Sequence, residues 1–465
     1  MRQSEALRIL HEGCSVFLTG APGSGKTYVL NRFVAAARES GAHVAVTAST
    51  GIAATHINGR TIHSWSGVGV STVLTDSLLR TIRSRRRRKI QEADVLVIDE
   101  VSMMQAWLFD MVDRVCRSLR NRPEPFGGLQ VVLSGDFFQL PPVSRATARG
   151  AEAMSNAARA SYDARGRDPD GFITQSRVWD ELSPVVCYLD EQHRQDDGRL
   201  LGVLTDIRGG LVDDGDRDAL AGRVGVSPED DAPTVHLFPM NRQADSLNAT
   251  RLAMIDSAER GFDSQKTGPA DLVRQLSRNM LAPEHLSLKK GAAVMALRND
   301  ADGQYVNGSI GTVRGFASTN DGGWPVVHFD NGNVCTMKPA SWEMMDGDSV
   351  LASVKQVPLR CAWAITIHKS QGMTLDTAVM DLRRSFAPGM GYVALSRVES
   401  MDGLFLEGIS ERAFAVSPAA VDLDGDLRAR SEDAVAALNE GNLRSFMGSS
   451  GAVEDQDEFM QSELF

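Results

Sequence analysis

The sequence has few cysteines, no long apolar run and no excess of basic charge. Its five cysteines are scattered over 465 residues without a CxxC pair, which argues against a zinc site or a disulfide framework and favours the reducing cytoplasm. No apolar run reaches the length of a membrane span, and the N-terminal "MRQSEALRIL" lacks a signal-peptide pattern. A net charge of −11 argues against a protein that coats nucleic acid widely, but it allows a narrow basic groove.

The composition is that of a globular protein with more than one domain. Apolar residues make up 42% of the chain and charged residues 23%, and the length exceeds one ordinary core. The segment 451–465 contains five acidic residues and no basic one. We expect this acidic tail to be disordered, and the alternative is a partner-binding peptide that ends in Leu464 and Phe465.

Short Val- and Leu-rich runs alternate with amphipathic stretches through most of the chain. Continuous apolar strands joined by helices indicate parallel sheets that are covered on both faces. The sequence therefore predicts an α/β fold with two parallel-sheet core domains. The runs of the first series are 15–20, 43–47, 94–99, 129–135 and 185–190, with helical patterns at 25–39 and 103–119, and the second series comprises 234–240, 377–382, 391–398 and 403–408.

A different pattern interrupts the second series. Short strands separated by Asn-Gly and Gly-rich turns predict a small antiparallel β-barrel inserted in the second core domain. The segment 144–171, rich in Ala, Arg, Gly and Asp, predicts a mobile loop. The expected domains are 1–225 for the first core, 226–284 with 355–430 for the second core, 285–354 for the barrel and 431–465 for the tail.

The stretch "GAPGSGKT" follows a strand and opens a helix, which is the context of a phosphate-binding loop. Its backbone N–H groups can surround a triphosphate, while Lys26 reaches the β- and γ-phosphates and Thr27 holds Mg²⁺. The alternative is a chance Gly-rich turn. The remaining loop residues assigned to ATP are Gly20, Gly23, Ser24 and Gly25.

The acids of "VLVIDE" stand at the end of an apolar strand. Asp99 is expected to hold Mg²⁺ through its water shell, and Glu100 to orient and deprotonate the attacking water. Paired acids at a strand end are otherwise merely solvated. Together with the phosphate loop they predict an NTPase, and Arg194 and Arg397 are candidates for a cationic finger from a second domain.

Eight motifs, in order along the chain, resemble those of the Pif-one (petite integration frequency) family, RecD-like DNA helicases of superfamily one. They are "FLTGAPGSGKT", "TASTGIAA", "GRTIHSWSG", "VIDEVSM", "PFGGLQVVLSGDFFQLPPV", "YLDEQHRQ", "AWAITIHKSQGMTLD" and "YVALSRV". The resemblance runs from Gln3 to about Gly408. It implies two RecA-like core domains, a wedge insertion at about 66–90 and an inserted Src-homology-type barrel.

The resemblance also implies roles around the nucleotide. Gln3 matches the glutamine that reads adenine, although a solvated helix-start residue is the alternative. Gln139 matches the residue that senses the γ-phosphate, and Arg194 and Arg397 match the two arginines that complete that site. Phe137 and Phe138, which follow the same apolar strand, either stiffen the path to the DNA or pack in the core.

A groove for single-stranded DNA is implied in both core domains. Hydroxyls and backbone amides can bind phosphates without high positive charge. No carboxylate or Cys stands at ligand spacing from either histidine of the set, so we assign them to DNA and not to a metal. The residues that match the family's groove are Thr50, Gly51, Thr61, His63, Thr366, His368, Lys369 and Ser370.

The function predicted is an ATP- and Mg²⁺-dependent DNA helicase, acting as a cytoplasmic monomer on single-stranded and partly duplex DNA. Movement from 5′ to 3′ is implied by the resemblance alone. One alternative is a DNA-stimulated ATPase that clamps or remodels nucleoprotein without unwinding, and another is a RecD-like subunit of a larger complex. The basic run from Arg85 to Lys89 is either a solvated helix end or a contact to DNA phosphates.

Overall fold

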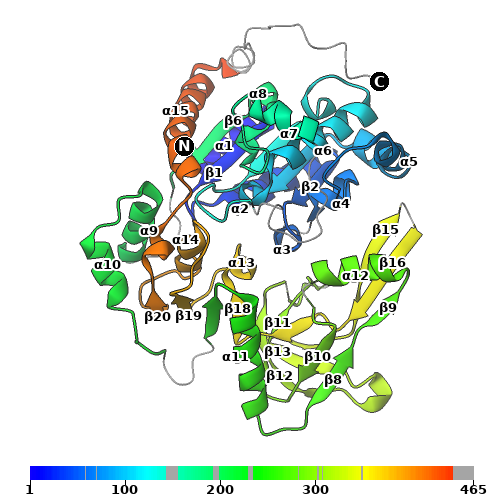
Figure 1. Ribbon diagram of the computed structural model, residues 1–465, viewed down its shortest axis with the longest axis vertical. Coiled ribbons are helices and arrows are strands. Elements are labelled where there is room, and N and C mark those ends of the chain that lie inside the picture. The colour runs from blue at the N-terminus through cyan, green and yellow to red at the C-terminus, as the bar shows by residue number, and fades with distance from the viewer. Residues whose placement is uncertain are drawn as a thin grey trace.

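The computed structural model describes residues 1–57, 59–69, 71–142, 156–191, 198–228, 234–280, 282–300, 303–305, 307–346 and 349–443. Two parallel sheets with their helices lie one above the other, and an antiparallel region lies beside the lower sheet (Figure 1). Arg194, the first part of the 144–171 segment and the acidic tail 451–465 lie outside the described residues.

The first core domain is built on a six-stranded sheet in the order β3-β2-β4-β5-β1-β6, and every pairing in it is parallel. This confirms the parallel-sheet prediction. The strands are β1 (Val16–Gly20), β2 (Val44–Ala48), β3 (Arg60–Thr61), β4 (Val95–Asp99), β5 (Gln130–Ser134) and β6 (Val185–Leu189).

Alternate residues of these strands supply two separate hydrophobic cores, because successive side chains of a strand point to opposite faces. Val16 and Leu18 pack with α1 (Gln3–His11), α2 (Lys26–Glu39) and the end of α15 (Pro418–Glu440). Phe17 and the side chains of β4 and β5 that point to the same face of the sheet pack in the other core. That core contains α4 (Ile62–Ser66), α5 (Asp76–Glu92), α6 (Ala106–Arg120) and α8 (Arg177–Leu182).

The strand order decides where the chemistry gathers. β4, β5 and β1 are neighbours, so the segments that follow their carboxyl ends meet at one edge of the sheet. These segments are the Gly20 loop, the acids Asp99 and Glu100, and the stretch from Gly135 to Gln139.

The second core domain contains a four-stranded parallel sheet in the order β18-β7-β19-β20. The run 391–398 is not a strand: it forms α14 (Met390–Leu395) and the turn after it. The strands are β7 (Val235–Phe238), β18 (Ala364–Thr366), β19 (Ala378–Leu382) and β20 (Leu404–Ile409), and the helices are α11 (Asn241–Met254) and α13 (Ile367–Ser370).

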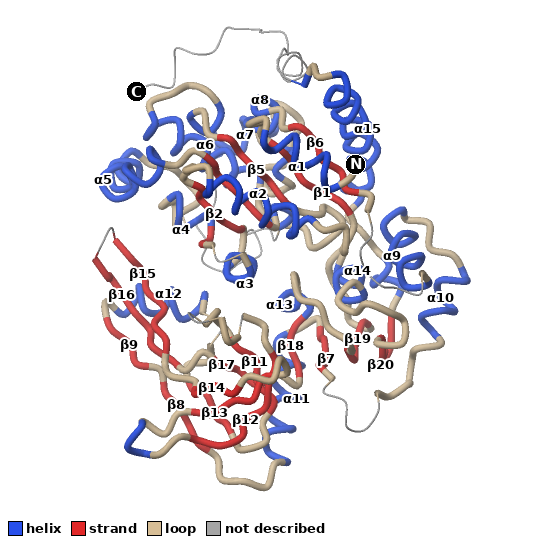
Figure 2. The backbone as a smooth tube through the Cα atoms, turned by 180° about the vertical axis from the view of Figure 1, so that it is seen from behind, coloured by secondary structure: helices blue, strands red, loops and turns tan. Residues whose placement is uncertain are grey.

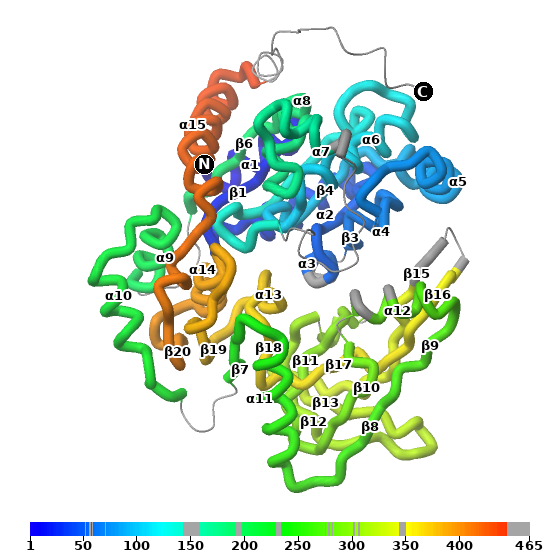
Figure 3. The backbone as a smooth tube through the Cα atoms, in the orientation of Figure 1, coloured from blue at the N-terminus to red at the C-terminus, as the bar shows by residue number. Residues whose placement is uncertain are grey.

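The two helices α9 (Arg199–Gly209) and α10 (Asp214–Ala221) lie beside α14 and β20 (Figure 3). The backbone after α10 joins this sheet, since the N–H of Gly225 donates to the carbonyl of Leu406. The expected boundary between the core domains, at 225, stays a prediction.

The insertion is antiparallel, as expected. A five-stranded sheet in the order β14-β13-β12-β11-β17 packs around its own core, and a three-stranded sheet, β15-β16-β9, extends toward the first domain (Figure 2). Antiparallel strands occur from Arg260 to Cys361, a longer stretch than the 285–354 of the sequence prediction. They are β8 (Arg260–Asp263), β9 (Gln265–Thr267), β10 (His285–Leu288), β11 (Ala293–Ala296), β12 (Ile310–Phe316), β13 (Pro325–Phe329), β14 (Val334–Thr336), β15 (Ala340–Asp346), β16 (Ser349–Gln356) and β17 (Leu359–Cys361), with α12 (Ala270–Asn279) among them.

Two segments differ from, or add to, the sequence predictions. The expected loop 144–171 contains a helix, α7 (Asn156–Asp163), which is anchored where the Tyr162 hydroxyl donates to Asp110 on α6. The expected wedge 66–90 is largely the helix α5, and the basic run lies on it. No helix in the described part of the chain is both long and apolar enough to cross a membrane.

Candidate ATP and DNA site

The phosphate loop leads from β1 into α2. Gly23 and Gly25 adopt φ of 83° and 85°, which glycine reaches without strain, and a Cβ on Gly25 would lie 2.0 Å from Gln3 Nε2. Lys26 Nζ donates to the carbonyls of Gly20 at 2.8 Å and Ala21 at 3.1 Å. Burial lowers the pKa of Lys26, and the nearby Asp136 carboxylate opposes that shift. Two carbonyls of the loop therefore hold the Lys26 ammonium group beside the turn, and this cation suits a phosphate.

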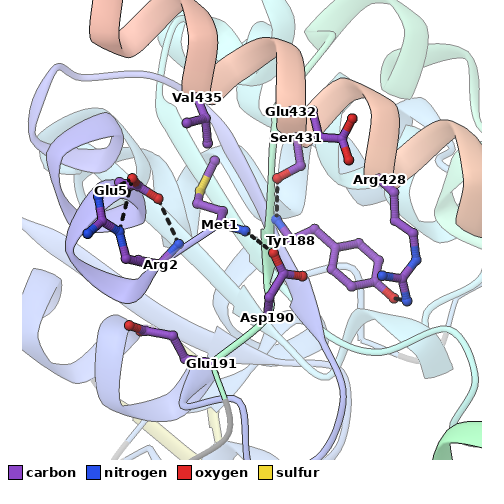
Figure 4. Close-up of a pocket in the computed structure, with 10 residues that line it drawn as sticks. All are labelled: Met1, Arg2, Glu5, Tyr188, Asp190, Glu191, Arg428, Ser431, Glu432 and Val435. Carbon is purple, nitrogen blue, oxygen red and sulfur yellow. Dashed lines mark hydrogen bonds and ion pairs between the residues drawn. The ribbon is translucent and has the colours of Figure 1, made fainter.

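Gln3 lies directly against this loop. Its Nε2 donates to the Ser24 carbonyl at 3.1 Å, and its backbone N–H donates to Glu191 at 2.8 Å. Its neighbours Arg2 and Glu5 line a pocket of about 600 Å³ between α1, the end of β6 and α15 (Figure 4). The structure thus brings the predicted adenine reader to the nucleotide loop, and its role in reading the base stays a prediction.

Asp99 and Glu100 follow β4, beside the phosphate loop. Burial raises the pKa of both carboxyls, that of Glu100 to about 7, where the neighbouring Asp99 adds to the shift. Thr27 is exposed at the start of α2. No group of three or more His, Cys, Asp or Glu side chains in the described ranges could hold a metal. One hydroxyl and one carboxylate fit Mg²⁺, which takes its other ligands from phosphate and water.

Gln139 is buried, with 6% of its surface exposed, and it touches the second domain. Its Oε1 accepts a hydrogen bond from Gln371 Nε2 at 3.1 Å, and the same Nε2 donates to Glu100 at 2.9 Å. Gly389 approaches so closely that a Cβ there would lie 2.5 Å from the Gln139 carbonyl oxygen. Gln371 was missed by the sequence analysis, although it belongs to the quoted motif "TIHKSQG".

Arg397 reaches the same place from α14. It is buried, and its attraction lowers the pKa of Glu100, which places its charge near that carboxyl group. Its Nη1 donates to the carbonyls of Ser370 at 3.2 Å and Met373 at 3.0 Å. Arg397 therefore also holds the loop that carries Gln371. The second finger candidate, Arg194, lies outside the described residues.

The predicted DNA residues of the first domain stand at helix starts. Thr50 Oγ1 accepts from the N–H of Ala53 at the start of α3 (Gly51–His56), and Thr61 Oγ1 accepts from the N–H of Ser64 and caps α4. Gly51 is exposed and His63 partly buried. α3 faces the second domain in both views (Figures 1 and 2). The structure brings these four residues to one side of the domain.

The predicted DNA residues of the second domain lie on α13 and just before it. His368 is stacked on the exposed ring of Phe386, and burial lowers the pKa of that histidine. Lys369 Nζ donates to Asn241 at 3.0 Å, and burial lowers its pKa to about 8. Thr366 and Ser370 are buried, and the Ser370 hydroxyl donates to the carbonyl of Ile367. The DNA contact of these two hydroxyls stays a prediction that the burial disfavours.

Phe137 and Phe138 belong to the core. Phe137 lies 5.0 Å from the ring of Phe17, and the guanidinium of Arg208 lies 4.1 Å from the ring of Phe138. Of the two alternatives for this pair, the structure favours packing over direct DNA contact.

A buried ion pair fixes the segment that carries Gln139. Arg208, on α9, donates to Asp136 at 2.7 Å and to Tyr392 of α14 at 3.0 Å, and the Tyr392 hydroxyl donates to the same carboxylate. Asp136 is fully buried and Arg208 is 6% exposed. Tyr188 links this cluster to α15 because its hydroxyl accepts from both Arg208 and Arg428.

We expect Arg208→Met to lower the free energy of unfolding by about 3–5 kcal/mol, because it leaves the Asp136 carboxylate buried and without its cation. Chemical denaturation followed by circular dichroism measures the change. Arg88→Ala is the control, because it breaks an exposed ion pair with Glu92 and should leave stability unchanged. Equal effects of the two substitutions would contradict the role of the buried pair.

Comparison with known proteins gives one consistent result. The profile described as "PIF1-like helicase" matches residues 4–199. The ATP-dependent DNA helicase Pif1 of Psychrobacter is 35% identical over 95% of this chain and 72% of its own length. The human ATP-dependent DNA helicase PIF1 is 33% identical over 92% of this chain, which spans 63% of that protein.

Solved structures agree over nearly the whole fold. A Pif1 helicase from Candida albicans superposes with a TM-score of 0.79 and 32% identity, covering 91% of this chain and 98% of that one. A Bacteroides Pif1 helicase in complex with ADP-AlF3 and single-stranded DNA has a TM-score of 0.68 and 27% identity, covering 92% of this chain and 96% of that one.

Proposed function

The chain belongs to the PIF1-like helicase family and is an ATP-dependent DNA helicase, and we propose that it moves 5′ to 3′ along single-stranded DNA as it separates a duplex. One observation carries the mechanism. The catalytic carboxylate of Glu100 in the first domain receives a hydrogen bond from Gln371 of the second, so the site is complete only when the two domains meet.

The residues of the first domain bind and activate. Lys26 holds the β- and γ-phosphates, and Glu100 takes a proton from the attacking water. Thr27, and Asp99 through the water shell, would hold Mg²⁺, which would supply charge neutralisation at the phosphates. Gln3 reads the base. Burial favours the neutral form of the Glu100 carboxyl, and the neighbouring cations Lys26 and Arg397 favour the ionised form that can accept a proton.

The second domain supplies the cation that completes the site. Arg397 is fixed by hydrogen bonds to Val393, Ser370, Met373 and Ser396, so its position follows the loop that ends α13. Loss of the γ-phosphate would remove one partner each from Gln139 and Arg397 and so weaken the contact between the domains. α3 and α13 then alternate in gripping the strand, and the enzyme advances.

The substrate is single-stranded DNA that continues into a duplex. We assign the contacts with the single strand to Thr50, Gly51, Thr61, His63, His368 and Lys369. We also propose that the enzyme acts as a monomer in the cytoplasm; the scattered cysteines support that reducing compartment. The wedge is α5, whose exposed arginines Arg83 and Arg87 face solvent on an otherwise acidic protein. An ATPase that clamps nucleoprotein without unwinding DNA would not require this insertion.

The polarity is tested with two duplexes of the same sequence, one with a 5′ and one with a 3′ single-stranded tail. We expect ATP-dependent strand separation only from the 5′ tail. Equal unwinding from both tails, or from the 3′ tail alone, would refute the polarity. ATP hydrolysis on single-stranded DNA with no unwinding of either duplex would favour the clamp.

A further inference from the structure

Glu100 is held by two loops, one from each core domain, and both loops also carry predicted DNA contacts. In the first domain the Ser49 hydroxyl donates to the Glu100 carbonyl at 2.6 Å, one residue before Thr50. In the second, Gln371 donates to the Glu100 carboxylate at 2.9 Å, one residue after Ser370. Glu100 itself adopts φ 53° and ψ 45°, a left-handed conformation that a non-glycine residue keeps only where its surroundings hold it.

The chemistry of the neighbours fixes which way the Gln371 amide points. The Glu100 carboxylate and the Gln139 side-chain oxygen Oε1 both accept hydrogen bonds, so Gln371 must turn its side-chain amino group toward them. The Gln371 Oε1 is buried and has no partner among the residues that the structure describes. It is therefore an acceptor beside the Glu100 carboxylate, where it can bind a water molecule.

The same bond orients Gln139. Because the side-chain oxygen Oε1 of Gln139 accepts from Gln371, the side-chain amino group of Gln139 is the end that can donate to another acceptor. Phosphate oxygens offer only acceptors, so an amino group is the end of the amide that can sense a γ-phosphate. Gln371 thus sets the orientation of two first-domain side chains at once.

Gln371 is not itself placed to touch DNA. Its surface is 6% exposed, whereas Lys369, two residues earlier, is only partly buried. Arg397 bonds to the carbonyls of Ser370 and Met373, on both sides of Gln371, so a shift of α13 must carry the amide with it.

We propose that Gln371 is a positioning residue that couples DNA binding to ATP hydrolysis, by turning Glu100 and Gln139 into their working orientation when α13 is seated on the strand. The proposal rests on the ATP-dependent helicase function given above. Glu100 performs the proton transfer, and Gln371 acts through it and through Gln139. Ser49 supports the same residue through the Glu100 backbone carbonyl.

The test compares steady-state ATP hydrolysis by the parent and Gln371→Met, which keeps the length of the side chain and removes its hydrogen bonds. We expect kcat at saturating single-stranded DNA to fall about 10- to 100-fold, the usual loss for a residue that orients a reacting group. The KM for ATP, and the affinity for single-stranded DNA without nucleotide, should change little. The double variant Gln139→Ala with Gln371→Met should show a smaller fold decrease in kcat than the product of the two single decreases, since the two amides act together.

Gln356→Met is the matched control. Gln356 is also a buried glutamine, but its Nε2 donates to carbonyls within the insertion, so its loss should lower the melting temperature and leave DNA-stimulated kcat unchanged. If Gln371→Met does not fold, Gln371→Glu, whose side chain has the same shape as glutamine, replaces it in the test. Retention of the parent's DNA-stimulated kcat by the Gln371 variants would overturn the proposal, as would an equal loss of DNA affinity without nucleotide. A parent without DNA-stimulated hydrolysis would instead refute the helicase function.

Discussion

Lys26→Ala is expected to abolish ATP hydrolysis and duplex unwinding while single-stranded DNA binding stays within a few fold of the parent. Lys26 is the ammonium of the phosphate loop, and its Nζ already lies among the loop carbonyls of Gly20 and Ala21. The predicted DNA contacts lie on other elements, α3, α4 and α13, so we expect hydrolysis to be lost without a loss of DNA binding. Hydrolysis is measured by phosphate release, and DNA binding by fluorescence anisotropy.

The control for Lys26→Ala lies on the same helix. Arg32 is exposed on α2 and donates to the Tyr28 hydroxyl of the same helix, so Arg32→Ala should hydrolyse ATP like the parent. ATP turnover by Lys26→Ala at a rate comparable with the parent would refute the assignment of the phosphate loop.

Arg397→Ala is expected to bind nucleotide and to hydrolyse it at least about 10³-fold more slowly, the low end for loss of an arginine finger. The structure adds a second cause, because Arg397 also holds the carbonyls on both sides of Gln371. Single-turnover hydrolysis with saturating enzyme measures the chemical step, and a fluorescent ATP analogue measures binding.

Arg412→Ala is the control for this prediction. Arg412 is an exposed arginine of the second core domain, and its loss should leave hydrolysis at the parent rate. If Arg397→Ala turned over ATP less than about tenfold more slowly than the parent, Arg397 would be a structural residue that fixes the loop after α13.

Local patterns in the chain were enough to place most of the elements. Continuous apolar runs indicated the strands β1, β4, β5 and β6, because strands buried on both faces show no alternation. The two-residue strand β3 and the three-residue strand β18 gave no such signal, and 391–398 became a helix where the series suggested a continuation of strands. Short apolar runs do not distinguish a buried helix from a buried strand.

The phosphate loop and the acids Asp99 and Glu100 were determined by the sequence itself. Their chemistry depends on residues close together in the chain, and the strand and helix that position them leave their own local pattern. The resemblance to a helicase family adds Gln139 and Arg397 to this predicted site, as residues of the γ-phosphate site.

Only the tertiary structure decided how the two core domains share one site. Gln371 bonds to Glu100 across 271 residues and to Gln139 across 232, and Arg208 pairs with Asp136 across 72. Spacing and periodicity report how a chain folds onto its near neighbours. They carry no information about which buried side chains meet when two sheets far apart in the chain pack together, and that packing brings the candidate site residues of the two domains into contact.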